Sequence, residues 1–279
     1  SIVTIPFTDL AVMDTKTISG SGLLREVKID DRTTTKWLWV AGASTRVYDI
    51  KTDPAVPALA ATVAQSTGNL AVSGNNLYAT DGQDLRSFNI TSPASFSHLA
   101  TVQTGYQSLN SIIMNGTNAY VGTTFGSNLA GRIIKFDVSN PSSIPTATDA
   151  TGSNKPISEM VLVGNYFYTA EVDTNGNSAI SAYTLSPFAW VSQLRDVGTD
   201  TSGDMYSIVH HLGYLYGTLR DQNKVAKWRL DTSTTLSYVS TYTHATGGAT
   251  PMDLMVSGSK IWLVTGNVSS AGQLEKHIL

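Results

Sequence analysis

The chain of 279 residues contains no cysteine and few charged residues. The absence of cysteine excludes disulfide bonds, thiolate nucleophiles and cysteine-ligated metal sites. Charged residues make up 14% of the chain and the formal net charge is −3, so no basic patch predicts binding to nucleic acid. No apolar run approaches the roughly 18 residues of a membrane-spanning helix, and residues 1–10 lack the basic and apolar regions of a signal peptide. We therefore expect no membrane span.

The polar residues of the chain are mostly Ser, Thr, Asn and Gly instead of charged residues. This composition is common in secreted, cell-surface and virion proteins. We expect an extracellular or cell-surface location, with the surface of a virion as one form of it.

An internal repeat is the strongest feature that the sequence does contain. Six short segments, each with an aromatic residue, recur at intervals of about 40 to 50 residues. They read KWLWVAG, NNLYATDG, TNAYVGTT, NYFYTAE, GYLYGTL and SKIWLVTG, and their aromatic markers are Trp39, Tyr78, Tyr120, Tyr168, Tyr216 and Trp262. A second strand follows in each repeat: RVYDI, RSFNI, IKFDV, SAYTL, AKWRL and EKHIL.

Five of the six repeats contain enough short, turn-bounded segments for four β-strands, and none of the six shows helical periodicity. Four strands at this period are typical of a β-propeller blade. The sequence therefore predicts an all-β fold: a single six-bladed β-propeller of four-stranded antiparallel blades that spans residues 1–279. The predicted blades cover about 15–64, 65–104, 105–151, 152–198, 199–243, and 244–279 together with 1–14.

The sixth repeat ends on EKHIL at residues 275–279 and has no fourth strand after it. When the start of the chain is placed after this end, residues from about Ile2 to Asp14 supply the missing strand. We therefore expect the N-terminal segment to pair with the C-terminal strand and close the ring, which would also cover an exposed sheet edge.

The repeat resembles those of the YVTN and LVIVD families of β-propeller proteins. The similarity is carried by the aromatic strand, the V-Y-D-I type strand and the Pro-containing links KTDPAVP, TSPASF and SNPSSIP. The fourth and fifth repeats depart from the Asp-x-Pro link. The resemblance implies a propeller of bacterial or archaeal surfaces or of exported proteins. Because the repeat motif is structural, the resemblance does not imply a catalytic activity.

One position, nine residues before the aromatic marker, is polar in each repeat and is expected at the start of the innermost strand. An insertion in the first repeat shifts its equivalent to Glu26 or nearby, and the complete set is Glu26, Asn69, Ser111, Glu159, Ser207 and Asp253. Such a ring of oxygen atoms could bind Ca²⁺, with Glu26, Asn69, Glu159 and Asp253 as ligands. Alternatively, these residues line a water-filled axis and satisfy backbone groups at the strand ends.

The same four candidate ligands resemble, in architecture and residue type only, the metal site of six-bladed lactonases of the gluconolactonase and paraoxonase type. That resemblance implies a calcium-dependent hydrolase or lactonase. No Gly-x-Ser-x-Gly, His-Glu-x-x-His or Walker motif supports other catalytic classes.

Loops on the same face as this ring provide candidate binding residues. They are Tyr106, Phe125, Asp173, Asn175 and His244. An exposed aromatic ring next to amide and carboxylate groups is typical of sugar binding, whereas the alternative is that these residues only anchor their loops. The preferred hypothesis is a non-catalytic surface or secreted propeller that binds a protein or glycan, or packs against copies of itself.

Overall fold

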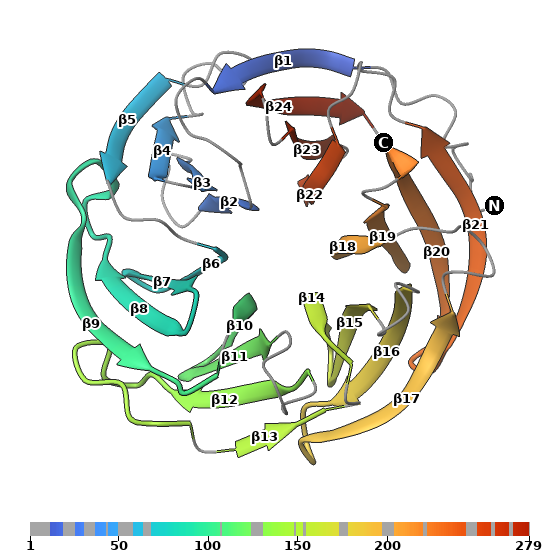
Figure 1. Ribbon diagram of the computed structural model, residues 1–279, viewed down its shortest axis with the longest axis horizontal. Coiled ribbons are helices and arrows are strands. Elements are labelled where there is room, and N and C mark those ends of the chain that lie inside the picture. The colour runs from blue at the N-terminus through green and yellow to red at the C-terminus, as the bar shows by residue number, and fades with distance from the viewer. Residues whose placement is uncertain are drawn as a thin grey trace.

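The strands of the computed structural model are arranged around a central axis (Figure 1). The structure describes residues 12–18, 26–30, 37–42, 44–49, 58–63, 68–106, 108–123, 131–147, 149–152, 155–172, 178–196, 204–219, 222–243, 250–257, 260–267 and 270–278.

The described strands form six antiparallel sheets of four strands each. The first three sheets contain β2 (Glu26–Asp30), β3 (Trp37–Ala41), β4 (Thr45–Asp49) and β5 (Ala58–Val63); β6 (Leu70–Ser73), β7 (Asn76–Asp81), β8 (Asp84–Asn89) and β9 (Ser97–Gln103); and β10 (Leu109–Asn115), β11 (Asn118–Thr123), β12 (Ile133–Asp137) and β13 (Asp149–Thr151). The next two contain β14 (Ile157–Val163), β15 (Tyr166–Val172), β16 (Ser178–Thr184) and β17 (Ala189–Asp196); and β18 (Met205–His211), β19 (Tyr214–Leu219), β20 (Lys224–Thr232) and β21 (Thr235–Thr243). The last contains β22 (Thr250–Ser257), β23 (Lys260–Asn267), β24 (Ser270–Ile278) and β1 (Val12–Ile18).

The innermost strands surround the axis (Figure 1). They contact one another in the order β2, β6, β10, β14, β18, β22 and back to β2. The prediction of an all-β propeller built from four-stranded antiparallel blades is confirmed. The described residues also include a 3-10 helix at Pro93–Ser95, and none of their helices has the length and hydropathy needed to cross a bilayer.

Strand β1, the first described strand, pairs with β24, the last one, at the outer side of one sheet (Figure 1). The register extends from Val12 opposite His277 to Ile18 opposite Gly272. The predicted segment, about 2–14, overlaps this strand only at 12–14, and residues 2–11 lie outside the described residues. The prediction came from aligning the start of the chain with the residues that follow RVYDI, and this alignment placed the strand too early. An outer strand is an edge and tolerates polar residues such as those of VMDTKTI.

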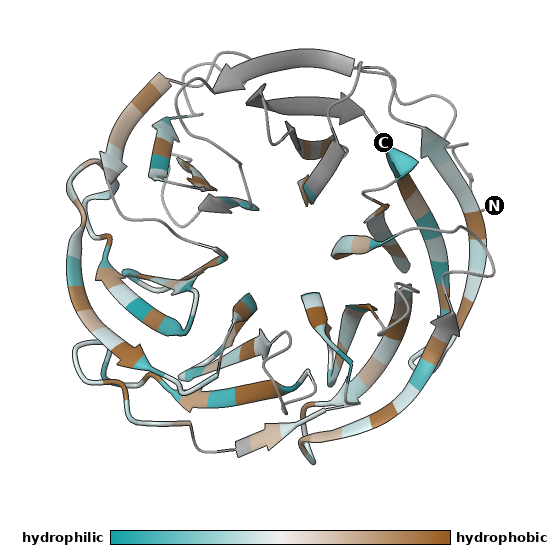
Figure 2. Ribbon diagram, in the orientation of Figure 1, coloured by the Kyte–Doolittle hydropathy of each residue, from teal (hydrophilic) through white to brown (hydrophobic). Residues whose placement is uncertain are grey.

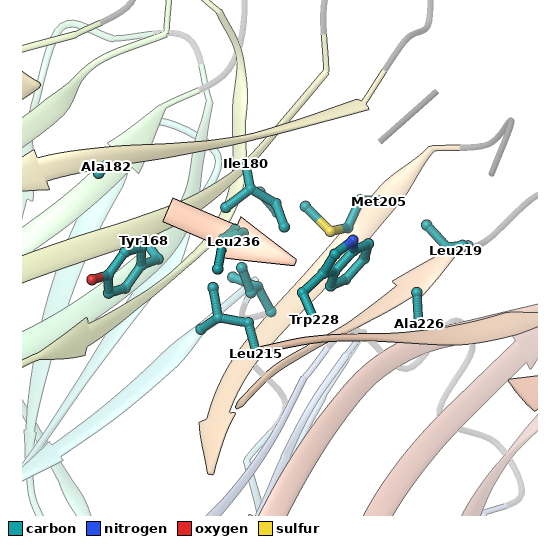
Figure 3. Packing of buried hydrophobic residues seen from close by; sticks show 11 residues of the cluster. Tyr168, Ile180, Ala182, Met205, Leu215, Leu219, Ala226, Trp228 and Leu236 are labelled. Carbon is teal, nitrogen blue, oxygen red and sulfur yellow. The ribbon is translucent and has the colours of Figure 1, made fainter. Parts of the chain in front are cut away.

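The hydrophobic core is divided among the interfaces between neighbouring sheets. In one interface, Tyr168 and Ile180 from one sheet pack with Met205 and Trp228 from the next (Figure 3). In Figure 2, hydrophobic and hydrophilic residues alternate along β9 and β17, as expected for strands with one face toward a neighbour. Because each fully buried large side chain stabilises the fold by roughly 1.5–3 kcal/mol, contacts between sheets hold the ring together.

Five of the aromatic markers of the repeat lie in the hydrophobic clusters: Trp39, Tyr78, Tyr120, Tyr168 and Tyr216. Tyr78 and Tyr168 are buried, and each reaches the next sheet with its hydroxyl group. The Tyr78 hydroxyl donates a hydrogen bond to the Val138 carbonyl at 3.3 Å, and the Tyr168 hydroxyl donates one to the Ser233 carbonyl at 2.9 Å. The marker therefore fills the interface with its ring and binds the neighbouring blade with its polar end.

The hairpin between β18 and β19 differs from its equivalents. Gly74, Gly116 and Gly164 occupy the first turn position in three other sheets, with φ of 54°, 59° and 59°. In the β18–β19 hairpin this position is Leu212, with φ of 48°, followed by Gly213 with φ of 81°. Leu212 is 80% exposed, so no burial offsets the cost of its left-handed backbone.

Replacing Leu212 by asparagine is expected to stabilise the protein. Two consecutive positive φ values favour Asn-Gly in a two-residue hairpin, and relief of the strain is worth about 1 kcal/mol. Urea unfolding of Leu212→Asn measures the gain. The control is Leu212→Ala, which removes the exposed side chain but keeps the strained backbone; equal stability of the two variants would contradict the explanation.

Candidate functional site

The six polar positions predicted for the axis lie at or near the start of the innermost strands. Glu26 begins β2, Asn69 precedes β6, and the other four lie within the first half of their strands. In four strands the pairing with the second strand shifts at this point: between Leu109 and Ser111, Ile157 and Glu159, Met205 and Ile208, and Pro251 and Asp253. A bulge leaves backbone groups outside the ladder, and these groups require other partners.

Glu159 satisfies such a group at the bulge of β14. The backbone N–H of Met160 donates to Glu159 Oε1 at 3.2 Å and to Ser111 Oγ at 3.1 Å. The Ser111 hydroxyl, from the preceding sheet, donates to Glu159 Oε1 at 2.8 Å. Because Ser111 and Glu159 are both buried, these bonds join two blades at the axis and provide acceptors for the Met160 N–H.

The same arrangement recurs between β18 and β22. The Ser207 hydroxyl donates to Asp253 Oδ1 at 2.6 Å. The backbone N–H of Leu254 donates to the same oxygen at 2.8 Å and to Ser207 Oγ at 3.4 Å. Two pairs of neighbouring sheets therefore use one serine and one carboxylate in the same way.

Glu26 is fully buried and also accepts from a neighbouring sheet. Its Oε2 accepts a hydrogen bond from the backbone N–H of Leu70. Its Oε1 lies 2.6 Å from the ammonium of Lys28. Lys28 follows Glu26 by two residues in β2, so both side chains project to the same face of the strand.

Asn69 does not join the carboxylates through its described contacts. Its side-chain amide and its backbone N–H both donate to Thr80 Oγ1, at 3.5 Å and 3.1 Å. Thr80 belongs to β7 of the same sheet. Asn69 therefore links the first two strands of its own blade.

The three carboxylates and Lys28 form one electrostatic cluster. Burial raises the pKa of Glu159 to about 7, with Lys28 opposing the shift and Asp253 adding to it. Burial also raises the pKa of Glu26, and Lys28 again opposes the shift. Burial lowers the pKa of Lys28, but Glu26, Glu159 and Asp253 outweigh this effect and raise it above the ordinary lysine value. The ammonium therefore stays charged at neutral pH.

The predicted calcium ligands thus lie in two environments. Glu26, Glu159 and Asp253 share the axial cluster, whereas Asn69 contacts Thr80. Within the described ranges, no three His, Cys, Asp or Glu side chains are grouped closely enough to hold one metal ion. The hydrogen bonds to Met160 and Leu254 show that the axial acids satisfy backbone groups at strand ends, as the alternative interpretation expects.

Only one of the predicted loop residues is described. Tyr106 is partly buried and packs against the hydrophobic cluster between the β6–β9 and β10–β13 sheets, so its ring acts as a loop anchor. Phe125, Asp173, Asn175 and His244 lie outside the described residues.

Sequence reasoning missed three notable side chains. Lys28 and Tyr206, which is 37% exposed and directly precedes Ser207, could have been found by extending the axial alignment to adjacent positions. Glu171 is fully buried and accepts hydrogen bonds from the hydroxyls of Thr169, Ser181 and Tyr183. Glu171 is isolated from the repeat pattern and gave no sequence signal.

Comparison with known proteins supports the fold but gives no information about the function. No protein-family model and no curated protein matches the chain. A crystal structure of the computationally designed Ika8 protein is similar with a TM-score of 0.55 and 8% identity, over 92% of this chain and 71% of that one. A chain in the crystal structure of the Mitotic Checkpoint Complex is similar with a TM-score of 0.64 and 13% identity, over 94% and 76%. At these identities the likeness shows a shared fold alone.

Proposed function

We propose that the protein is a non-catalytic β-propeller that binds a protein or a glycan, or assembles with copies of itself, on a cell surface, in a secreted assembly or on a virion. The observation that carries the proposal is the set of contacts made by the three axial carboxylates, Glu26, Glu159 and Asp253. Glu159 and Asp253 accept hydrogen bonds from the neighbouring sheet and from the next backbone N–H, and Glu26 contacts Lys28 and Leu70 N. These contacts give the carboxylates a structural role.

Binding is proposed for the face on which the innermost strands begin. Tyr206 supports this choice because its partly exposed ring lies immediately before the axial Ser207. An aromatic ring beside polar groups can stack on a sugar or contribute to a protein interface.

The proposal includes the six-bladed form of the ring, closed by the pairing of the two chain ends, and a repeat of the YVTN or LVIVD type. The cycle of contacts among the innermost strands and the pairing of β1 with β24 support the closed six-bladed form. The quoted repeat motifs support the repeat type, and with it an exported or surface location.

A comparison of the unmodified chain with Tyr206→Ala tests the function. Binding is measured on a glycan array and, in parallel, by chemical cross-linking in the native assembly. A glycan or a protein contact on this face that weakens at least about tenfold in the variant, a loss of about 1.4 kcal/mol, supports the proposal. Binding confined to the opposite face, where Leu212 lies, would contradict it; Leu212→Ala is therefore the matched control.

The alternative function is a calcium-dependent hydrolase or lactonase at the axial carboxylates, in which the ion polarises a carbonyl group. Its test is hydrolysis of lactone and ester substrates with calcium or with a chelator. Calcium-dependent turnover that disappears in Glu159→Gln would favour this alternative over a binding module.

A further inference from the structure

We propose that Lys28 is a cation built into the propeller axis, and that its ammonium group balances the axial carboxylates in place of a bound metal ion. The proposal goes beyond the binding function, because it states which positive charge of the protein balances the negative charges of the axial carboxylates. It rests on the position of one side chain and on the charges around it.

The first argument is contact. The Lys28 ammonium lies 2.6 Å from Glu26 Oε1, so the two groups form an ion pair. Glu26 is completely buried, and a buried carboxylate without a partner is strongly destabilising. The Leu70 N–H partners the other oxygen, Oε2, so Lys28 completes the coordination of this carboxylate.

The second argument is that the charge of Lys28 acts on more than one carboxylate. Lys28 interacts electrostatically with Glu159 and Asp253 as well as with Glu26, although these residues belong to three different sheets. The contacts of Glu159 with described residues all fall on Oε1. A single ammonium therefore acts on the whole acidic part of the ring.

The third argument comes from the repeat. Two positions after the axial residue, the strand again presents a side chain to the same face. The six residues at this position are Lys28, Ala71, Ile113, Val161, Val209 and Met255. The lysine is the charged exception in an otherwise apolar set, and it occurs in a blade that also contributes an axial carboxylate.

A double-mutant cycle at residues 26 and 28 tests the proposal. Lys28→Met removes the charge but keeps the side-chain length, and its melting temperature is expected to fall by on the order of 5 °C because Glu26 loses its partner. Glu26→Gln combined with Lys28→Met is expected to recover most of this loss, since no unpaired carboxylate is left at position 26.

Two further variants serve as controls: one removes a lysine elsewhere in the protein, and the other changes residue 28 but keeps its charge. Lys155→Met removes a partly exposed lysine that forms a solvent-exposed hydrogen bond with Gln193, and it is expected to change the melting temperature little. Lys28→Arg keeps the charge and is expected to melt near the unmodified chain, which also provides a folded comparison if Lys28→Met fails to fold. A Lys28→Met variant as stable as Lys155→Met, or a Lys28→Arg variant that melts as low as Lys28→Met, would overturn the proposal.

The last part of the test measures the effect of calcium on the melting temperature. The melting temperature of the unmodified chain is expected to be the same with calcium and with a chelator, because the counter-charge is covalently attached. A saturable rise in melting temperature with calcium would mean that an external cation fills this role, and it would overturn the proposal.

Discussion

A chain that lacks residues 1–18 is expected to unfold at a much lower temperature than a chain that lacks only residues 1–11. The difference between the two deletions isolates β1, which pairs with β24 from Val12 to Ile18. Losing this strand removes a row of backbone hydrogen bonds whose net worth is about 5 kcal/mol. The corresponding fall in melting temperature is about 10 °C or more.

The second consequence of removing β1 concerns association. Strand β24 would become an unpaired edge, which is a template for pairing with another chain. The longer deletion is therefore also expected to form dimers or aggregates in analytical ultracentrifugation. Equal melting temperatures for the two deletions would show that the pairing of the chain ends does not hold the ring.

The stability of the unmodified protein is expected to fall as the pH rises from about 4.5 to about 7, and Glu159→Gln is expected to remove part of this fall. Burial raises the pKa of Glu159 from 4.5 to about 7, so the folded state holds a proton that the unfolded state releases. The stabilisation is complete below pH 4.5 and is lost as the pH rises through 7. A shift of this size corresponds to about 3 kcal/mol.

Urea unfolding across this pH range measures the effect. Glu26 contributes in the same direction because its pKa is also raised, so the variant is expected to keep a smaller slope. Asp137→Asn is the control: Asp137 is partly exposed, and hydrogen bonds from Ser139 lower its pKa instead of raising it. A pH profile of Glu159→Gln that matches the unmodified chain would refute the assignment.

The fold was predictable because the repeat combines two strong local signals. Aromatic strands such as β7 follow tight turns, and a turn glycine lies four residues before the aromatic marker in three of the sheets, at Gly74, Gly116 and Gly164. The axial position was also predictable, since counting from the marker gave Glu159 and Asp253, which the structure places near the start of innermost strands. Periodicity specifies which residues share a position in the blade.

Periodicity does not specify contacts between blades. The bond from Ser111 to Glu159 and the ion pair of Lys28 with Glu26 depend on bulges and on the approach of separate sheets, which no local pattern encodes. The limits of β1 were missed for a related reason. An edge strand is selected by its partner β24 and not by its own hydrophobicity, so the polar segment VMDTKTI gave no strong signal.

The most direct test of the structural role of the axial carboxylates is a crystal structure of the unmodified chain. The crystals are grown with calcium, and anomalous scattering locates any bound ion. We predict no ion on the axis, with the Lys28 ammonium against Glu26 and with Glu159 and Asp253 bonded to Ser111 and Ser207. An ion that contacts Glu159 and Asp253, with Lys28 turned away from Glu26, would contradict the account.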